Sequence, residues 1–155
     1  MTNDATKTTK NFPAMLHDLG GNIDEVRDGY ARGHLPLSLQ VMQPSQVYHA
    51  GAIVILADEV ASAAIVGSIG RPVSEDKKLF PYSIQISTNL LTNDPEGPIT
   101  AESKVVKRGR IVVVDTEVVG SKGQLVALVR STHAMVDPTK VGPHKREIFT
   151  GNKND

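Results

Sequence analysis

The chain of 155 residues has the size of about one domain, and its 17 basic and 17 acidic residues leave no net charge. It contains no cysteine, which excludes disulfides, thiolate nucleophiles and cysteine-ligated zinc. The zero net charge, the absence of tryptophan and the small number of Phe and Tyr, three of each, argue against nucleic acid as a partner.

No stretch of the chain predicts a membrane segment or a secretory signal. Residues 1–12 lack the apolar region that a signal peptide needs. The longest apolar stretch, residues 50–69, contains Asp58 and Glu59, and this acidic pair makes membrane insertion costly. We therefore expect a cytoplasmic protein with no membrane partner, and the lack of cysteine fits a reducing compartment.

The first half of the chain predicts a tail, a short helix and one strand. Residues 1–10 are polar and are expected to form a flexible tail. Residues 138–155 are rich in charge, proline and glycine, and we expect them to form a C-terminal tail that is irregular or loosely docked. A single domain is expected between them, over residues 11–137. Within it, a short helix is predicted in residues 11–20 and a first strand in residues 33–42.

Residues 50–69 predict a long central helix, because they are rich in alanine and contain no proline. Gly70, Arg71 and Pro72 are expected to end it. The helix is apolar nearly all round, which predicts that it is buried nearly all round.

The second half predicts four consecutive strands. Alternating or β-branched residues place them at 82–91, 99–107, 110–119 and 124–136, with a hairpin connection at 120–123. Separate helical and strand-rich segments favour an α+β fold with an antiparallel sheet. We expect four or five strands wrapped round the central helix, and a second copy of the chain covering what remains exposed.

One face of the predicted helix carries small and polar residues. Gly51, Ile55, Asp58 and Ser62 share that face through spacings of four, three and four. A partly desolvated Asp58 carboxylate suits a general base, although a solvent-facing residue or a dimer contact explains the pattern as well. Glu59 is rotated by about 100° from Asp58, so only one of the two is expected on this face.

Gly51 lies in the first turn of the predicted helix, where backbone N–H groups have no intrahelical acceptor. Such an N–H group suits the oxyanion of a thioester under attack, although close helix–sheet packing also explains a glycine here. Gly51 and Asp58 are about 10 Å apart along the helix axis. If both act on one thioester, they must come from different subunits.

The chain resembles the hotdog-fold thioesterases of the phenylacetate-pathway (PaaI-like) type over residues 43–58, which read Gln-Pro-Ser-Gln-Val-Tyr-His-Ala-Gly-Ala-Ile-Val-Ile-Leu-Ala-Asp. That family carries an Asn, a His-Gly-Gly turn six residues later, and Leu-Ala-Asp or Leu-Ala-Glu on its central helix. The segment 105–132 is similar to the family's paired long strands, and the resemblance covers roughly residues 35–137. It implies a hotdog fold, a homodimer or homotetramer, and hydrolysis of an acyl-coenzyme A thioester.

The resemblance also implies roles for five residues. Asp58 matches the acidic residue that acts as general base or nucleophile, and Gly51 matches the glycine whose N–H polarises the thioester carbonyl. His49 matches the turn histidine. Gln43 falls where the family usually has Asn, which positions water or the carbonyl. Ser83 falls where some relatives place a Ser or Thr that orients water.

Further residues are expected at the substrate. Glu59 directly follows Asp58, so either carboxylate is a candidate, and we group Glu59 with the substrate-binding residues. Lys107, Arg108 and Arg110 form the densest basic cluster, which suits the phosphates of coenzyme A or a solvated hairpin tip.

Two functions follow from these expectations. The first is an acyl-coenzyme A thioesterase that needs no metal and no cofactor besides the coenzyme A of its substrate. The alternative is a non-catalytic module that binds acyl-coenzyme A or lipid. The sequence gives no acyl-chain identity, and it does not separate the general-base route from the nucleophilic route.

Overall fold

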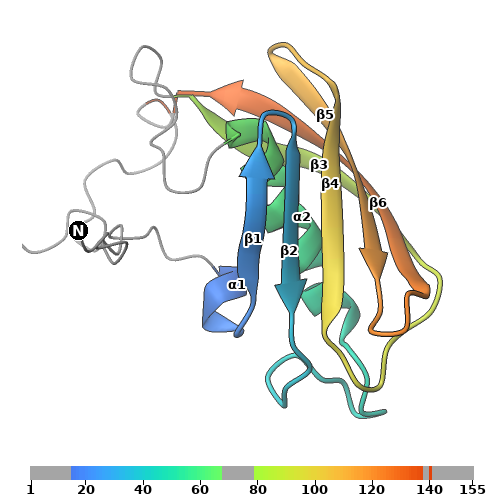
Figure 1. Ribbon diagram of the computed structural model, residues 1–155. Coiled ribbons are helices and arrows are strands. Elements are labelled where there is room, and N and C mark those ends of the chain that lie inside the picture. The colour runs from blue at the N-terminus through green and yellow to red at the C-terminus, as the bar shows by residue number, and fades with distance from the viewer. Residues whose placement is uncertain (1–14, 68–78, 138–139, 141–155) are drawn as a thin grey trace, which may run out of the picture.

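A single antiparallel sheet of six strands curves around one long helix in the computed structural model, which describes residues 15–67, 79–137 and 140 (Figure 1). The strand order is β1-β2-β4-β5-β6-β3. The elements are α1 (Met15–Asp18), β1 (Asn22–Arg27), β2 (Tyr30–Leu35), α2 (Ala50–Val66), β3 (Phe80–Leu90), β4 (Ile99–Lys107), β5 (Ile111–Val119) and β6 (Leu125–Val136). This confirms the predicted α+β class and the sheet wrapped round a central helix.

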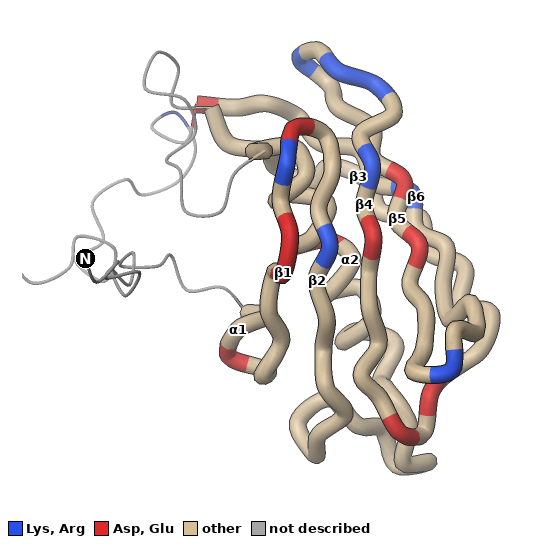
Figure 2. Tube along the Cα trace, viewed as in Figure 1, with Lys and Arg blue, Asp and Glu red and all other residues tan. Residues whose placement is uncertain are grey.

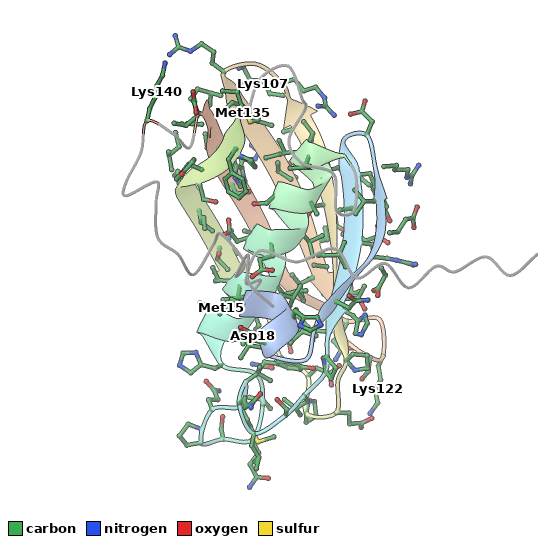
Figure 3. All side chains as sticks on the ribbon, turned by 90° about the vertical axis from the view of Figure 1, so that its left-hand side faces the viewer. Met15, Asp18, Lys107, Lys122, Met135 and Lys140 are labelled. Carbon is green, nitrogen blue, oxygen red and sulfur yellow. The ribbon has the colours of Figure 1, made fainter. Side chains whose placement is uncertain are left out.

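Helix α2 packs its most apolar side against the concave face of the sheet. Figure 3 shows the helix lying across that face. Its buried residues are Ala52, Ile53, Leu56, Ala57, Val60, Ala61, Ala64 and Ile65. The face predicted to carry Gly51, Ile55, Asp58 and Ser62 stays partly or fully exposed. The sheet therefore buries one side of the helix, and the expected cover of the remaining face by a second copy of the chain stays a prediction.

Helix α2 ends earlier than the sequence predicted. Gly67 adopts a left-handed backbone conformation with φ of 71°, and its N–H donates to the carbonyl of Ala63 at 2.9 Å. This glycine cap ends the helix before Gly70 is reached. The predicted stop at Gly70, Arg71 and Pro72 lies outside the described residues.

The sequence also missed the hairpin formed by β1 and β2. In place of one strand over residues 33–42, the chain turns at Asp28 and Gly29, and the second strand ends at Leu35, before Pro36. Asp-Gly is a strong two-residue hairpin signal, and Gly29 has the positive φ of 73° that such turns require. The added hairpin raises the number of strands from the expected four or five to six.

The four strands of the second half lie within one residue or two of their predicted bounds, and β4 coincides with residues 99–107. Their order in the sheet differs from their order in the chain, because β3 pairs with β6 at the far edge of the sheet and not with β4. This crossing carries β3 to the edge of the sheet, where it pairs with β6 on one side and with no other described strand.

Residues 1–10, predicted as a tail, lie outside the described part of the chain, as do residues 138–155 apart from Lys140. Within the described residues, no helix combines the length and the apolar character that spanning a membrane requires.

We predict that Gly67→Ala lowers the free energy of unfolding by about 1 kcal/mol, because alanine pays a steric cost at positive φ that glycine avoids. Urea denaturation measures this change. Asn tolerates the left-handed region better, so Gly67→Asn serves as the matched control and is expected to lose less stability. Equal losses in the two variants would contradict the left-handed cap.

Candidate functional site

The carboxylate of Asp58 receives a short hydrogen bond from the neighbouring edge strand. Asp58 lies in the middle of α2 and is half-buried. The hydroxyl of Ser83, on β3, donates to Asp58 Oδ1 at 2.5 Å. No residue in the described part of the chain hydrogen-bonds the second carboxylate oxygen, Oδ2. The structure thus brings together two residues that the sequence analysis named separately.

A fully buried histidine contacts the serine of this pair. His133 on β6 faces Ser83 across the strand pair, and its Nδ1 lies 3.3 Å from Ser83 Oγ. Its Nε2 lies 2.8 Å from the hydroxyl of Ser131, which is buried as well. Neither residue was predicted from the sequence. Their inward alternation on a strand was visible, but the register that sets His133 opposite Ser83 is a property of the folded sheet.

The donor and the acceptor can be assigned along the series of hydrogen bonds that starts at Asp58. Ser83 has a single hydroxyl proton, and it donates this proton to Asp58. His133 Nδ1–H is therefore the donor to Ser83 Oγ, and in a neutral imidazole Nε2 then accepts from the Ser131 hydroxyl. Burial lowers the pKa of His133, while the nearby Asp58 charge opposes this shift in part. Burial thus favours the neutral imidazole, with the proton on Nδ1.

Glu59 points to another part of the molecule. Its carboxylate accepts a hydrogen bond from the backbone N–H of Leu16 at 2.8 Å, which anchors α1 to α2. Burial raises the pKa of Glu59, partly offset by this hydrogen bond. Of the two adjacent carboxylates, Asp58 is the one that contacts Ser83.

His49 caps the N-terminus of α2. Its backbone is extended, and its ring Nδ1 accepts a hydrogen bond from the N–H of Gly51 at 2.9 Å. The backbone carbonyl of His49 accepts from Ala52 N at 3.0 Å, which begins the helix. The N–H group that the sequence analysis assigned to an oxyanion is therefore occupied by an imidazole, although both residues are exposed.

Gln43 lies in the loop before this cap. Its side-chain amide donates to Ser45 Oγ at 2.8 Å, and its backbone carbonyl accepts from Gln46 N at 2.9 Å in a tight turn. Gln46 has a φ of 66°, a conformation that favours glycine. Gln43 makes no contact with Asp58 in the single chain.

The basic cluster of Lys107, Arg108 and Arg110 forms an exposed tip between β4 and β5, drawn blue in Figure 2. Arg108 pairs with Asp28 in the β1–β2 turn at 2.6 Å, and Lys107 Nζ donates to the carbonyl of Ile111 at 3.3 Å. Figure 3 places Lys107 at one end of the sheet and Lys122 at the other. The tip thus belongs to the end of the molecule where α2 finishes, away from His49.

Two further features lie apart from this chemistry. Among residues 15–67, 79–137 and 140, no group of three or more His, Asp or Glu side chains is arranged to hold a metal ion. A surface hollow of about 260 Å³ lies over β3, β5 and β6, beside the ion pair of Asp115 and Arg130. None of the residues named above as site candidates lines it.

Solved structures of thioesterases share this architecture, although no protein-family model matches the chain. A variant of the thioesterase SAV0944 from Staphylococcus aureus superposes with a TM-score of 0.70 at 24% identity, covering 78% of this chain and 97% of that one. The Escherichia coli PaaI protein, from the phenylacetic acid degradation operon, gives 0.69 at 23% identity and covers 79% and 84%. A hypothetical thioesterase from Streptococcus pneumoniae, solved with coenzyme A, gives 0.63 at 18% identity and covers 75% and 88%.

The chain has the hotdog fold. The resemblance to PaaI-like thioesterases inferred from the sequence is thereby confirmed at the level of the fold. In this hotdog chain, the hydrogen bond between Asp58 and Ser83 joins the central helix to the edge strand β3. His49 and Gly51 lie at the start of that helix.

We predict that His133 makes the hotdog domain less stable as the pH falls below about 6.5, the pKa of an ordinary histidine. The pKa of His133 is lowered in the folded state, so the unfolded chain binds this proton first, and stability falls at no more than about 1.4 kcal/mol per pH unit. Urea denaturation between pH 7 and pH 5 measures the loss. The variant His133→Asn cannot titrate and should show a smaller loss. An identical pH dependence in both proteins would contradict the assignment.

Proposed function

We propose that this protein is a thioesterase that hydrolyses an acyl-coenzyme A thioester. The observation that carries the proposal is the Asp58 carboxylate, held by the Ser83 hydroxyl and backed by the buried His133. A fold does not fix a function, so the proposal rests on this group of side chains and not on the hotdog architecture alone.

The solved thioesterases support the same position. Two variants of SAV0944 replace a glutamine and a glutamate by alanine, and these two positions are fifteen residues apart in that protein. Gln43 and Asp58 have the same separation in this chain. The streptococcal thioesterase solved with coenzyme A supports coenzyme A as the thiol part of the substrate.

Asp58 supplies the proton transfer in the proposed reaction. Its Oδ2 atom takes a proton from water as the water oxygen attacks the thioester carbon, and the carbonyl oxygen becomes an oxyanion. When the carbon–sulfur bond breaks, the thiolate of coenzyme A takes that proton back from Asp58. The alternative is direct attack by the carboxylate, which gives a mixed anhydride that water then hydrolyses. Neither route uses a cofactor beyond the coenzyme A of the substrate.

Ser83 and His133 hold the carboxylate of Asp58 in position for this step. The Ser83 hydroxyl holds Oδ1 in place through its hydrogen bond. The His133 imidazole in turn orients the Ser83 hydroxyl through the contact between His133 Nδ1 and Ser83 Oγ. The result is a carboxylate with one oxygen anchored and the other directed to substrate.

The oxyanion donor in this proposal is the N–H of Gly51. Because Gly51 and Asp58 lie about 10 Å apart on one rigid helix, one carbonyl cannot contact both. We therefore propose that Asp58 acts with the partner's Gly51. The substrate carbonyl must also displace the ring of the histidine that caps this N–H in the free protein.

A second copy of the chain fits the open edge of β3. Among the described strands, this edge strand pairs with β6 alone, and it exposes the large apolar side chains of Phe80, Ile84, Ile86 and Leu90. An open apolar edge invites pairing with another strand, and a twofold pair of β3 strands extends the sheet across the dimer. The opposite edge, β1, carries Asp24, Glu25 and Arg27, which discourage such pairing.

The basic tip is proposed to bind the phosphates of coenzyme A. Arg110 and Lys107 are exposed there, whereas Arg108 already pairs with Asp28. Guanidinium and ammonium groups are the usual partners of phosphate in proteins.

One observation favours the alternative, a binding module without turnover. The imidazole of His49 holds the N–H of Gly51, so the proposed oxyanion donor is not free in this structure. A protein in which this contact persists would bind acyl-coenzyme A without hydrolysing it.

We predict that the wild-type protein releases free thiol from at least one member of a panel of short, long and aromatic acyl-coenzyme A thioesters. Asp58→Asn should lower kcat by about 100-fold or more, because the amide still accepts from Ser83 but takes no proton. The chain has no cysteine, so a thiol reagent reports released coenzyme A alone. Asp115→Asn, on the outer face of the sheet, is the matched control. Binding without turnover in the wild type would favour the module.

We predict that Ile84→Lys converts the oligomer to a monomer, because a charged side chain on the open β3 edge prevents pairing. Ile84 is 58% exposed in the single chain, and Val106 on β4 is 54% exposed, so Val106→Lys is a control of matched exposure. Analytical ultracentrifugation gives the masses. A monomeric wild type, or an unchanged oligomer in Ile84→Lys, would exclude the β3 interface.

A further inference from the structure

The side chain of Asn93 clamps the backbone of a residue 45 positions earlier. Its Oδ1 accepts from the N–H of Tyr48 at 3.0 Å, and its Nδ2 donates to the carbonyl of the same residue at 2.9 Å. Oδ1 also accepts from the N–H of Asp94 at 2.8 Å. Because backbone N–H groups only donate and carbonyls only accept, these three contacts define the orientation of the amide.

The loop that carries Asn93 is held in place by the hydrogen bonds of its neighbour, Asp94. The next residue, Asp94, is fully buried, and its carboxylate accepts backbone N–H groups from Glu96 and Gly97 at 2.7 Å and from Ser121. Burial alone would raise the pKa of Asp94, but these hydrogen bonds outweigh it and hold that pKa well below its usual range. The ionised carboxylate therefore ties the β3–β4 loop to the β5–β6 connection.

The clamped residue stands immediately before the cap of α2. Tyr48 is fully buried, and its hydroxyl donates to the carbonyl of Leu35 at 2.7 Å, while burial raises its pKa to about 12. His49 follows it, with its N–H bonded to the carbonyl of Val41 at 2.8 Å. The clamp thus fixes the peptide that leads into the His49–Gly51 turn.

We propose that Asn93 is a positioning residue that sets the direction of the Gly51 N–H at the start of α2. This inference rests on the proposed thioesterase function for its catalytic consequence, but not for its structural content. A small error in the placement of an oxyanion donor weakens transition-state binding more than substrate binding. Loss of the clamp therefore acts on kcat and leaves KM nearly unchanged.

The test compares Asn93→Asp with Tyr48→Phe in the full-length protein. The aspartate retains an acceptor for the two N–H groups but places a second oxygen against the Tyr48 carbonyl. The phenylalanine removes a buried hydrogen bond from the same residue and leaves the backbone clamp intact. Asn93→Ala, which removes all three contacts, is measured alongside in case the aspartate variant does not fold.

Two readouts are taken on each folded variant. We expect Asn93→Asp to lower kcat by about 10- to 100-fold, the cost of misplacing a group by about 1 Å, with KM within about twofold of the wild type. The amide NMR signals of His49 and Gly51 should move in this variant. In Tyr48→Phe, kcat and those two signals should stay close to the wild type.

An unchanged kcat with unmoved His49 and Gly51 signals in both Asn93 variants would overturn the proposal. Equal effects in Tyr48→Phe would overturn it too, because they would show a general loss of stability. If the wild type hydrolyses no thioester, the proposed function fails, and the amide signals alone then decide whether Asn93 positions the turn.

Discussion

The carboxylate of Asp58 is the group around which the rest of this structure is arranged. A charged group on a helix packed into an apolar core needs a polar partner, because desolvation without a hydrogen bond is costly. Helix α2 buries Ile53 and Leu56 against the sheet and turns Asp58 toward the edge strand, where Ser83 satisfies it. The buried His133 completes the contact from β6. Asp58, Ser83 and His133 thus form one hydrogen-bonded group where the central helix meets β3 and β6.

The same helix is the reason that the proposed thioester site needs a second chain. The Gly51 N–H and Asp58 are fixed about 10 Å apart on one rigid element, so no side-chain movement brings them to one carbonyl. The β3 strand that carries Ser83 is also the strand with the open apolar edge. In the proposed dimer, pairing at that edge brings a second α2 toward the first, so that the strand which orients the proposed base also brings in the proposed oxyanion donor of the partner.

Local patterns predicted the parts of the fold that depend on local sequence. The β4, β5 and β6 strands and most of α2 follow from residue type and periodicity, and Asp58 follows from its place on an apolar helix. The β1–β2 hairpin was missed, because its charged outward residues hide the alternation and only Asp28-Gly29 signals the turn. His133 was missed because a strand's alternation does not reveal which residue lies opposite. Sequence spacing likewise gave no hint that Glu59 anchors α1.

Subunit complementation tests the composite thioester site most directly. Asp58→Asn and Gly51→Pro chains are co-expressed with different affinity tags, and the mixed oligomer is purified through both tags. Proline removes the backbone N–H of position 51 and is tolerated in the first turn of a helix. Each variant alone should be inactive. The mixed dimer should recover about half of the wild-type turnover, because one of its two sites combines an intact Asp58 with an intact Gly51 from the other chain. A mixed dimer with no recovered turnover would contradict a site shared between two chains.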